Sequence, residues 1–309
     1  MKILVTGGAG FIGSHVVDAL LQKNSEVIIV DNLSTGKKEN INSSAKFIEA
    51  DITEFGRMDE IFVTEKPEVI FHLAAQIDVR KSVADPMGDA KTNILASLNL
   101  IRLSHQYAVK KFIFASTGGA IYGDTDERPT PEKSPEWPLS PYGIAKLTVD
   151  KYLFYHQAVY GLPYTSLRYG NVYGPRQNPH GEAGVVAIFL NKMLKGEQPV
   201  INGTGNQVRD YVYVADVVRA NMAALDNFSA LGVYNVGTSV ETSVVDLFAE
   251  INRSFDGQFK EEHGPAKPGE QLTSCLDFTR IQAELGWAPQ MGIKEGLQAT
   301  YEWFKNNNQ

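Results

Sequence analysis

This 309-residue sequence has a single cysteine, and what it lacks excludes several classes of protein and site. The single cysteine, Cys275, excludes an internal disulfide and suits a reducing compartment, so we expect a cytoplasmic protein. Glycine residues interrupt the apolar run at the start, which predicts neither a signal peptide nor a membrane span. The six histidines show no close ligand spacing such as HExxH, so we expect no metal site.

Basic residues are also fewer than acidic residues. The chain has 29 Lys and Arg against 36 Asp and Glu, which gives a formal net charge of −7. This balance argues against a nucleic acid or an anionic membrane as the main partner. An anionic small ligand stays compatible, because a pocket can carry local positive charge inside a negative protein.

Short apolar segments alternate with helical patterns over the first half of the chain. Strands are predicted at 2–6, 26–30, 46–50, 68–72, 110–116 and 163–168, and helices at about 11–22, 54–64, 90–107 and 141–160. This alternation predicts an α/β fold with a Rossmann-type, doubly wound parallel sheet. We expect residues 1–170 to form this domain, with some later segments returning to it. Residues 171–309 are expected to form mainly a smaller mixed α/β domain that binds the substrate.

A glycine-rich turn follows the first predicted strand, with GxxGxxG spacing at Gly7, Gly10 and Gly13. The first glycine permits a sharp turn, the second lets the backbone approach a pyrophosphate, and the third allows close packing of helix on sheet. Asp31 ends the next strand, where a carboxylate accepts ribose hydroxyls and repels a 2′-phosphate. The carboxylate predicts NAD rather than NADP as cofactor. The alternative for the glycine-rich segment is an ordinary tight turn that binds no dinucleotide.

Tyr142 and Lys146 are the candidate catalytic pair. Their four-residue spacing places both side chains on one face of a predicted helix. A tyrosine with a pKa of about 10 is a poor base at neutral pH, but a neighbouring ammonium and a positive nicotinamide ring would both favour the phenolate. Thr117 or Ser116, at the end of the fifth strand, would hydrogen-bond the reacting oxygen. We favour Thr117.

These motifs together resemble the extended short-chain dehydrogenase/reductases, and within them the UDP-glucose 4-epimerase family, over essentially the whole chain. The resemblance rests on segments 7–13, 72–75, 116–123, 142–146, 168–175 and 208–214. It implies transient oxidation of a UDP-hexose at C4 by NAD, through a 4-keto intermediate, interconverting UDP-glucose and UDP-galactose. The residues that it assigns to NAD are Gly7, Gly10, Phe11, Ile12, Gly13, Asp31, Asn32, Ser34, Thr35, Gly36, Asp51, Ile52, Leu73, Ala74, Ala75, Gln76, Asn93, Tyr142, Lys146 and Tyr169.

The same resemblance implies a set of substrate-binding residues. Arg209 is expected to clamp the diphosphate, because a guanidinium matches phosphate oxygens in a bidentate manner. Lys267 stands where relatives often carry a second arginine. The full set is Thr117, Tyr142, Asn171, Arg176, Gln207, Arg209, Lys267, Glu270 and Ser274. Relatives pair through two long helices, here about 90–107 and 141–160, so a homodimer is expected.

Gly118 and Gly119 distinguish between reactions within this family. In the family that this chain resembles, the sugar dehydratases carry an Asp-Glu pair directly after the threonine that corresponds to Thr117. The decarboxylases keep a glutamate there. A glycine pair cannot protonate a leaving hydroxyl, so we favour an epimerase. A decarboxylase, a dehydratase, a reductase that releases its cofactor and a non-catalytic sensor of NAD or sugar nucleotide stay as alternatives.

Ser274 is the expected determinant of N-acetyl specificity. In the resembling epimerases, a position after the Gly-Asp/Glu turn, here Gly269-Glu270, limits the space beside the sugar C2. A tyrosine there excludes N-acetyl sugars, whereas a small residue admits them. We therefore expect both the plain and the N-acetylated UDP-hexoses to be accepted, unless Ser274 faces away from the pocket.

Overall fold

The structure, a computed structural model, describes residues 1–180, 184–266 and 271–307. Within these residues, seven strands form one sheet in which every pairing is parallel. In spatial order they are β11 (Gly232–Val236), β6 (Tyr164–Tyr169), β5 (Lys111–Thr117), β4 (Val69–His72), β1 (Lys2–Thr6), β2 (Glu26–Asp31) and β3 (Lys46–Glu49). The strand order reverses between β1 and β4, the place where doubly wound sheets bind ligands. The predicted Rossmann-type fold is confirmed.

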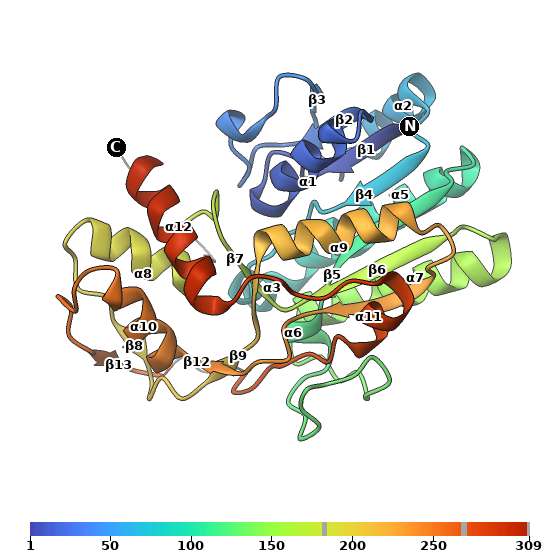
Figure 1. Cartoon of the computed structure of the whole chain (residues 1–309). Helices are drawn as coiled ribbons and strands as arrows, with labels where there is room; N and C mark the ends of the chain where they lie inside the picture. The colour runs from blue at the N-terminus through green and yellow to red at the C-terminus, as the bar shows by residue number, and fades with distance from the viewer. Residues whose placement is uncertain (181–183, 267–270, 308–309) are drawn as a thin grey trace.

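Helices cover both faces of this sheet (Figure 1). One face carries α1 (Phe11–Gln22), α9 (Val214–Asp226) and α11 (Thr279–Leu285). The other carries α2 (Phe55–Glu65), α5 (Ala96–Gln106) and α7 (Pro141–Tyr160). Successive strand residues point to opposite faces, so Val5 packs in the first core and Leu4 in the second. Burial on both faces explains why the strands are continuously apolar.

The helix predicted from residue 90 to residue 107 is interrupted near its start. After α3 (Val79–Ala84) and α4 (Pro86–Ala90), the residues Lys91–Leu95 form a π-helical turn that precedes α5. This wider turn holds Asn93, whose amide nitrogen donates to the Gln76 carbonyl oxygen and to the Asp89 carboxylate at 2.8 Å each. The prediction treated residues 90–107 as one regular helix and did not include this π-turn.

A second, smaller core lies beside the sheet and is built from residues after β6 (Figure 1). Its paired strands are β7 (Asn171–Tyr173) with β10 (Tyr211–Tyr213), β9 (Val208–Arg209) with β12 (Thr242–Ser243), and β8 (Ile201–Asn202) with β13 (His263–Gly264). Its helices are α8 (Val185–Leu194), α10 (Val244–Arg253) and α12 (Ile293–Asn307). The elements β11, α9 and α11 follow residue 170 in the chain but pack on or in the large sheet. The division of the chain into two domains at residue 170 stays a prediction.

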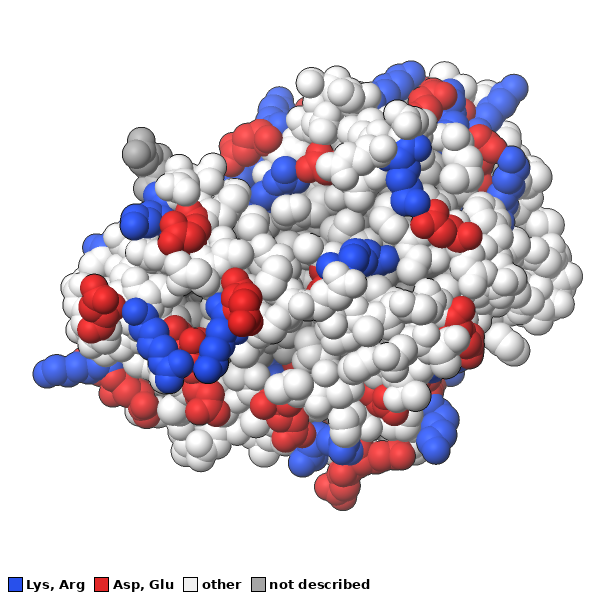
Figure 2. Space-filling view, in the orientation of Figure 1, with Lys and Arg blue, Asp and Glu red and all other residues white. Residues whose placement is uncertain are grey.

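Acidic and basic side chains are interspersed over the face drawn in Figure 2. On that face, charge of neither sign gathers into one patch, in keeping with the modest net charge of −7. None of the helices in the described ranges has both the length and the apolar run that crossing a membrane requires.

Candidate functional site

The turn after β1 brings backbone segments so close that only glycine fits. A β-carbon on Gly7 would lie 2.6 Å from the Ala74 backbone nitrogen, and one on Gly13 would lie 2.1 Å from the Gly7 carbonyl oxygen. Gly7 also has a φ of +74°, which side-chain-bearing residues rarely adopt. Gly10, the residue directly before α1, has no side chain that could cap the helix, so the helix N-terminus is open to an anion. This cradle fits the pyrophosphate of NAD.

Asp31 lies at the end of β2, directly beside that turn. Its buried carboxylate accepts hydrogen bonds from the backbone nitrogens of Ala9, at 2.9 Å, and Leu33, at 2.8 Å. A β-carbon on Gly36 would come within 2.8 Å of it, so the loop that follows β2 folds closely around this carboxylate. Backbone bonds from two sides therefore fix Asp31 where the sequence predicts a ribose acceptor.

Asn32 and Asp51 extend this acidic edge of the site. The Asn32 amide nitrogen donates to the Asp51 carboxylate at 2.7 Å, and its oxygen accepts from the Ser34 hydroxyl at 2.7 Å. Burial raises the pKa of Asp51, but hydrogen bonds from Thr53 and Asn32 outweigh burial and hold that pKa below its ordinary value. The carboxylate of Asp51 is thus kept ionised as an acceptor. Ile52, beside it, packs in the core.

A buried chain of hydrogen bonds fixes the segment after β4. His72 Nδ1 lies 2.7 Å from the Thr6 hydroxyl, and Nε2 lies 2.8 Å from the Ser97 hydroxyl. Burial, with a smaller effect of the Lys146 ammonium, lowers the pKa of His72 to about 3, so the ring is neutral. Thr6 also accepts from the Ala74 nitrogen at 3.3 Å. His72 therefore acts as a structural link that holds the predicted cofactor segment 73–76.

The helix α7 presents the Tyr142 and Lys146 pair. It begins with Pro141, and the Ser140 hydroxyl accepts from the Gly143 nitrogen at 3.1 Å, which caps its first turn. The buried Lys146 ammonium donates to the Ala115 carbonyl oxygen at 2.8 Å and lies 5.9 Å from the centroid of the Tyr142 ring. The pair thus lies against the end of β5, two residues before Thr117.

Burial has opposite effects on the two members of the pair. It lowers the pKa of Lys146 to about 8, although the Asp150 and Asp89 carboxylates raise it. Burial raises the pKa of Tyr142 above its ordinary value, and Asp89 raises it further. Without NAD, the net shift of the Tyr142 pKa is therefore upward, and the Lys146 ammonium is directed at the Ala115 carbonyl oxygen. The favouring of the phenolate by Lys146 together with the nicotinamide ring stays a prediction. The positive nicotinamide ring of oxidised NAD would supply the charge that favours the phenolate.

Thr117 ends β5, and α6 (Gly118–Ile121) follows it directly. A β-carbon on Gly119 would lie 4.0 Å from Thr117 Oγ1, 3.8 Å from Asn171 Oδ1 and 3.7 Å from Ser274 Oγ. Three of the predicted substrate-binding residues are therefore brought together around Gly119, although they come from distant parts of the chain. The Ser274 hydroxyl is directed toward this group rather than away from it.

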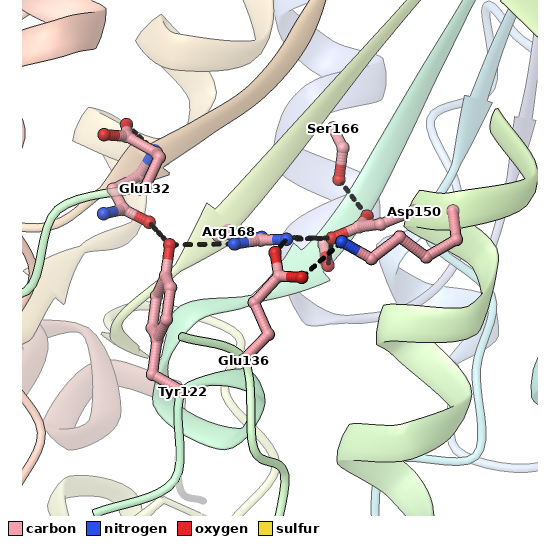
Figure 3. Close-up of polar contacts among 9 residues, drawn as sticks. Tyr122, Glu132, Glu136, Asp150, Ser166 and Arg168 are labelled. Atoms are coloured by element: carbon pink, nitrogen blue, oxygen red, sulfur yellow. Dashed lines mark hydrogen bonds and ion pairs between the residues drawn. The ribbon is translucent and has the colours of Figure 1, made fainter. Parts of the chain in front are cut away.

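Ser116 lies instead on the α7 side of β5, at a buried polar network whose Asp150, Arg168 and Glu136 are labelled in Figure 3. Its hydroxyl donates to the Asp150 carboxylate at 3.3 Å. The same carboxylate accepts from Arg168 Nε at 3.0 Å and Nη2 at 2.9 Å, and from the Ser166 hydroxyl at 2.5 Å. Arg168 also donates to the Tyr122 hydroxyl and to Glu136. This network occupies Ser116, so we keep Thr117 alone as the candidate catalytic hydroxyl.

Other predicted substrate residues do not join the group around Gly119. Arg176 forms an ion pair with Asp18 of α1 at 2.8 Å, and its expected contact with the sugar nucleotide has no support from that position. Arg209 donates to the carbonyl oxygens of Val208, at 2.9 Å, and Gln271, at 2.6 Å.

The remaining predicted residues are held at other points. The Gln207 amide donates to the Asn202 carbonyl oxygen at 3.1 Å. The hydroxyl of Tyr169, predicted to contact NAD, donates to Asn221 at 3.1 Å. Lys267 and Glu270 lie outside the described residues.

Two buried carboxylates near the pair were missed by the sequence reasoning. Asp89 accepts from Gln76 and Asn93 at 2.9 and 2.8 Å, and Asp150 pairs with Arg168. Asp150 had a usable signal, because it follows Tyr142 and Lys146 at the same four-residue spacing on one helix face. Asp89 had no such signal, because the π-turn that carries its partner Asn93 is not visible in the sequence.

Comparison with known proteins gives consistent results. Residues 3–237 match the NAD dependent epimerase/dehydratase family. The structure is similar to a UDP-glucose 4-epimerase of Thermotoga maritima with UDP-glucose, with 51% identity, a TM-score of 0.97 and complete coverage of both chains. The Thermus thermophilus UDP-glucose 4-epimerase, in complex with NAD, is 43% identical, with a TM-score of 0.93 and coverage of 99% and 100%. A UDP-N-acetylglucosamine 4-epimerase of Methanobrevibacter ruminantium is 35% identical, with a TM-score of 0.93 and coverage of 99% and 98%.

Proposed function

Because the chain belongs to the NAD dependent epimerase/dehydratase family, and within it to the UDP-glucose 4-epimerases, we propose that it interconverts UDP-glucose and UDP-galactose in the cytoplasm. The observation that carries the proposal is the meeting of Thr117, Asn171 and Ser274 around Gly119, at the strand end where α7 presents Tyr142 and Lys146. Hydroxyl and amide groups of this kind suit a hexose, and the tyrosine supplies a base.

NAD, the cofactor of this family, would supply reversible acceptance of a hydride from C4 of the sugar. The chain contributes the glycine cradle of Gly7 and Gly13 for the pyrophosphate and the Asp31 carboxylate for the ribose. Tyr142 takes the proton of the 4-hydroxyl group, and Thr117 hydrogen-bonds the same oxygen. Tight binding of the nucleotide half, to which Arg209 and Gln207 contribute, leaves the keto sugar free to turn.

The glycine pair after Thr117 separates epimerisation from dehydration. Gly118 and Gly119 offer no acid to protonate a leaving hydroxyl group, and neither Ser274 nor Asn171, which face Gly119, has an acidic side chain. In the described part of the chain, the site at the end of β5 therefore has the groups for reversible proton removal but not for elimination.

Incubation with UDP-glucose in the absence of added NAD tests the proposed reaction. The expected result is an equilibrium mixture with UDP-galactose, resolved by NMR, and release of NAD when the purified protein is denatured. A 4-keto-6-deoxy product would identify a dehydratase, and loss of carbon dioxide a decarboxylase. A requirement for added reduced cofactor would identify a reductase, and no turnover with retained NAD a sensor.

The N-acetyl range is expected to depend on Ser274. Its hydroxyl faces Gly119, as does that of Thr117, and a small side chain at residue 274 would leave room for a 2-acetamido group. Ser274→Tyr should overpack this buried position, at a cost of about 1–3 kcal/mol, and remove activity on UDP-N-acetylglucosamine while largely sparing UDP-glucose. The ratio of kcat/KM for the two substrates measures the effect. Equal loss of both would indicate general damage, and no loss would place Ser274 outside the pocket.

The outer face of α7 is the proposed homodimer surface. Ile144, Tyr152, Tyr155 and Val159 follow one helix face, and each is between 41% and 57% exposed. The ring of Tyr160, the last residue of α7, lies 4.7 Å from the ring of His105 in α5, which continues the surface onto that helix. A symmetric pair of copies would bury these side chains against each other. This is the arrangement that the family resemblance implies.

We expect Val159→Asp to shift the protein toward monomer in sedimentation analysis, because it places a charge in this apolar face. The matched control is Val63→Asp, which changes a similarly exposed valine on α2, outside the proposed surface. A dimer that survives Val159→Asp, or a comparable loss in both variants, would contradict this assignment of the interface.

A further inference from the structure

The two adjacent glycines of α6, Gly118 and Gly119, have different surroundings. A β-carbon on Gly118 would lie 2.4 Å from Cδ1 of Leu276, so the leucine side chain already fills that space. On Gly119, the nearest atoms to a β-carbon are the oxygens of Ser274, Asn171 and Thr117, none closer than 3.7 Å. Neither glycine has the positive φ that would require glycine for backbone reasons. Of the two, only Gly119 therefore has room for a β-carbon, and we call this room the space at Gly119.

The three oxygens around this space are available for hydrogen bonding. Within the described part of the chain, Thr117 Oγ1, Asn171 Oδ1 and Ser274 Oγ have no hydrogen-bond partner, although the Asn171 and Ser274 backbone nitrogens are bonded to the carbonyl oxygens of Asp210 and Val208. Their segments are thus held in place while their side-chain oxygens face the space at Gly119. Such an arrangement suits a polar ligand group, because a hydroxyl or amide oxygen without a protein partner can hydrogen-bond a ligand.

We propose that Gly119 is a specificity-determining residue, and that the space left by its missing side chain receives the C2 side of the hexose ring. This inference rests on the proposed function, since it takes the ligand to be a UDP-hexose. A methyl group at residue 119 would stand in van der Waals contact with all three oxygens and leave no room for a ligand atom between them. The bulkier the substituent at C2, the greater the loss should be.

The experiment compares Gly119→Ala with wild type on ligands of increasing size. Alanine has a higher helix propensity than glycine and meets no close contact here, so the melting temperature should not fall. We expect unchanged affinity for UDP, a loss of about tenfold in kcat/KM for UDP-glucose, and a loss of about a hundredfold or more for UDP-N-acetylglucosamine. If the N-acetyl sugar is not turned over by wild type, its inhibition constant takes the place of kcat/KM.

Two further variants keep the result interpretable. Gly118→Ala is the matched control, and it should lower the melting temperature because its β-carbon would clash with Leu276. The double variant Gly119→Ala/Ser274→Gly should recover at least about tenfold of the lost activity on UDP-N-acetylglucosamine, because removing the hydroxyl restores space on the opposite side. No recovery would mean that the two positions do not share one space.

Equal losses for UDP and both sugars, or no loss at all, would overturn the role of Gly119. A different result would contradict the proposed function. A wild-type protein that epimerises no UDP-sugar contradicts that function alone, and calorimetric binding of UDP and the two UDP-sugars to wild type and Gly119→Ala still tests the space at Gly119.

Discussion

Tyr142→Phe should lower kcat by at least about a hundredfold, the scale of a lost general base. The substitution removes one oxygen atom and keeps the ring that lies beneath the Lys146 ammonium. Its backbone nitrogen still donates to the Ser82 hydroxyl, so the start of α7 should be unchanged. We therefore expect a folded protein that retains NAD and binds UDP-glucose with nearly wild-type affinity, but turns it over very slowly. Steady-state kinetics, with released NAD measured on the same preparation, test this.

The matched control is Tyr152→Phe, which removes a hydroxyl from a partly exposed tyrosine on the same helix. Tyr152 belongs to the proposed homodimer surface, but the change keeps its aromatic ring, so it should leave kcat within a factor of about two. Near wild-type turnover in Tyr142→Phe would end the proposed mechanism. Equal losses in both variants would point to the helix rather than to the base.

Asp150→Ala should destabilise the protein by about 3–5 kcal/mol, the cost of leaving a buried charge without its partner. Arg168 is 1% exposed and Asp150 is 2% exposed, so water cannot replace the lost carboxylate. A guanidinium stays protonated in proteins, so Arg168 cannot shed its charge when the Asp150 carboxylate is removed. Glu136 stays as one acceptor, but the two hydrogen bonds to Asp150 are lost (Figure 3). Urea unfolding followed by circular dichroism measures the change.

The double variant Asp150→Ala/Arg168→Met distinguishes charge burial from simple loss of packing. Removing both charges should recover a substantial part of the stability, because a buried pair and an apolar replacement are often similar in energy. Kinetics of the folded fraction serve as a second readout. If Asp150→Ala unfolds at the wild-type urea concentration, the network in Figure 3 contributes little to the fold.

The cofactor edge of the site could be predicted because its requirements are local. Within one turn, Gly7 has a positive φ and a β-carbon on Gly13 would meet the Gly7 carbonyl oxygen, and Asp31 ends the adjoining strand. Tyr142 and Lys146 were identifiable from spacing on one helix. Each of these signals lies within a few residues of sequence, where periodicity and turn chemistry are informative.

The rest of the site depends on partners that are distant in sequence. The choice between Ser116 and Thr117 depends on which of two alternating strand residues faces α7, and only packing fixes that phase. Arg176 was expected at the sugar nucleotide, but its partner is Asp18 in the first helix. The opposite sign of the Tyr142 pKa shift follows from burial and from Asp89, neither of which spacing reveals.

The position of β11 at the edge of the large sheet has a consequence for synthesis of the chain. β6 leaves the ribosome well before β11, because residues 170–231 must be made between them. Until then β6 has a free edge, and the sheet face that α9 will cover is open to water. The nascent nucleotide-binding half therefore cannot be completed on its own, and a chain that stops near residue 170 should be prone to aggregation. Completion of the large sheet is in this way tied to synthesis of the first part of the residues that follow β6.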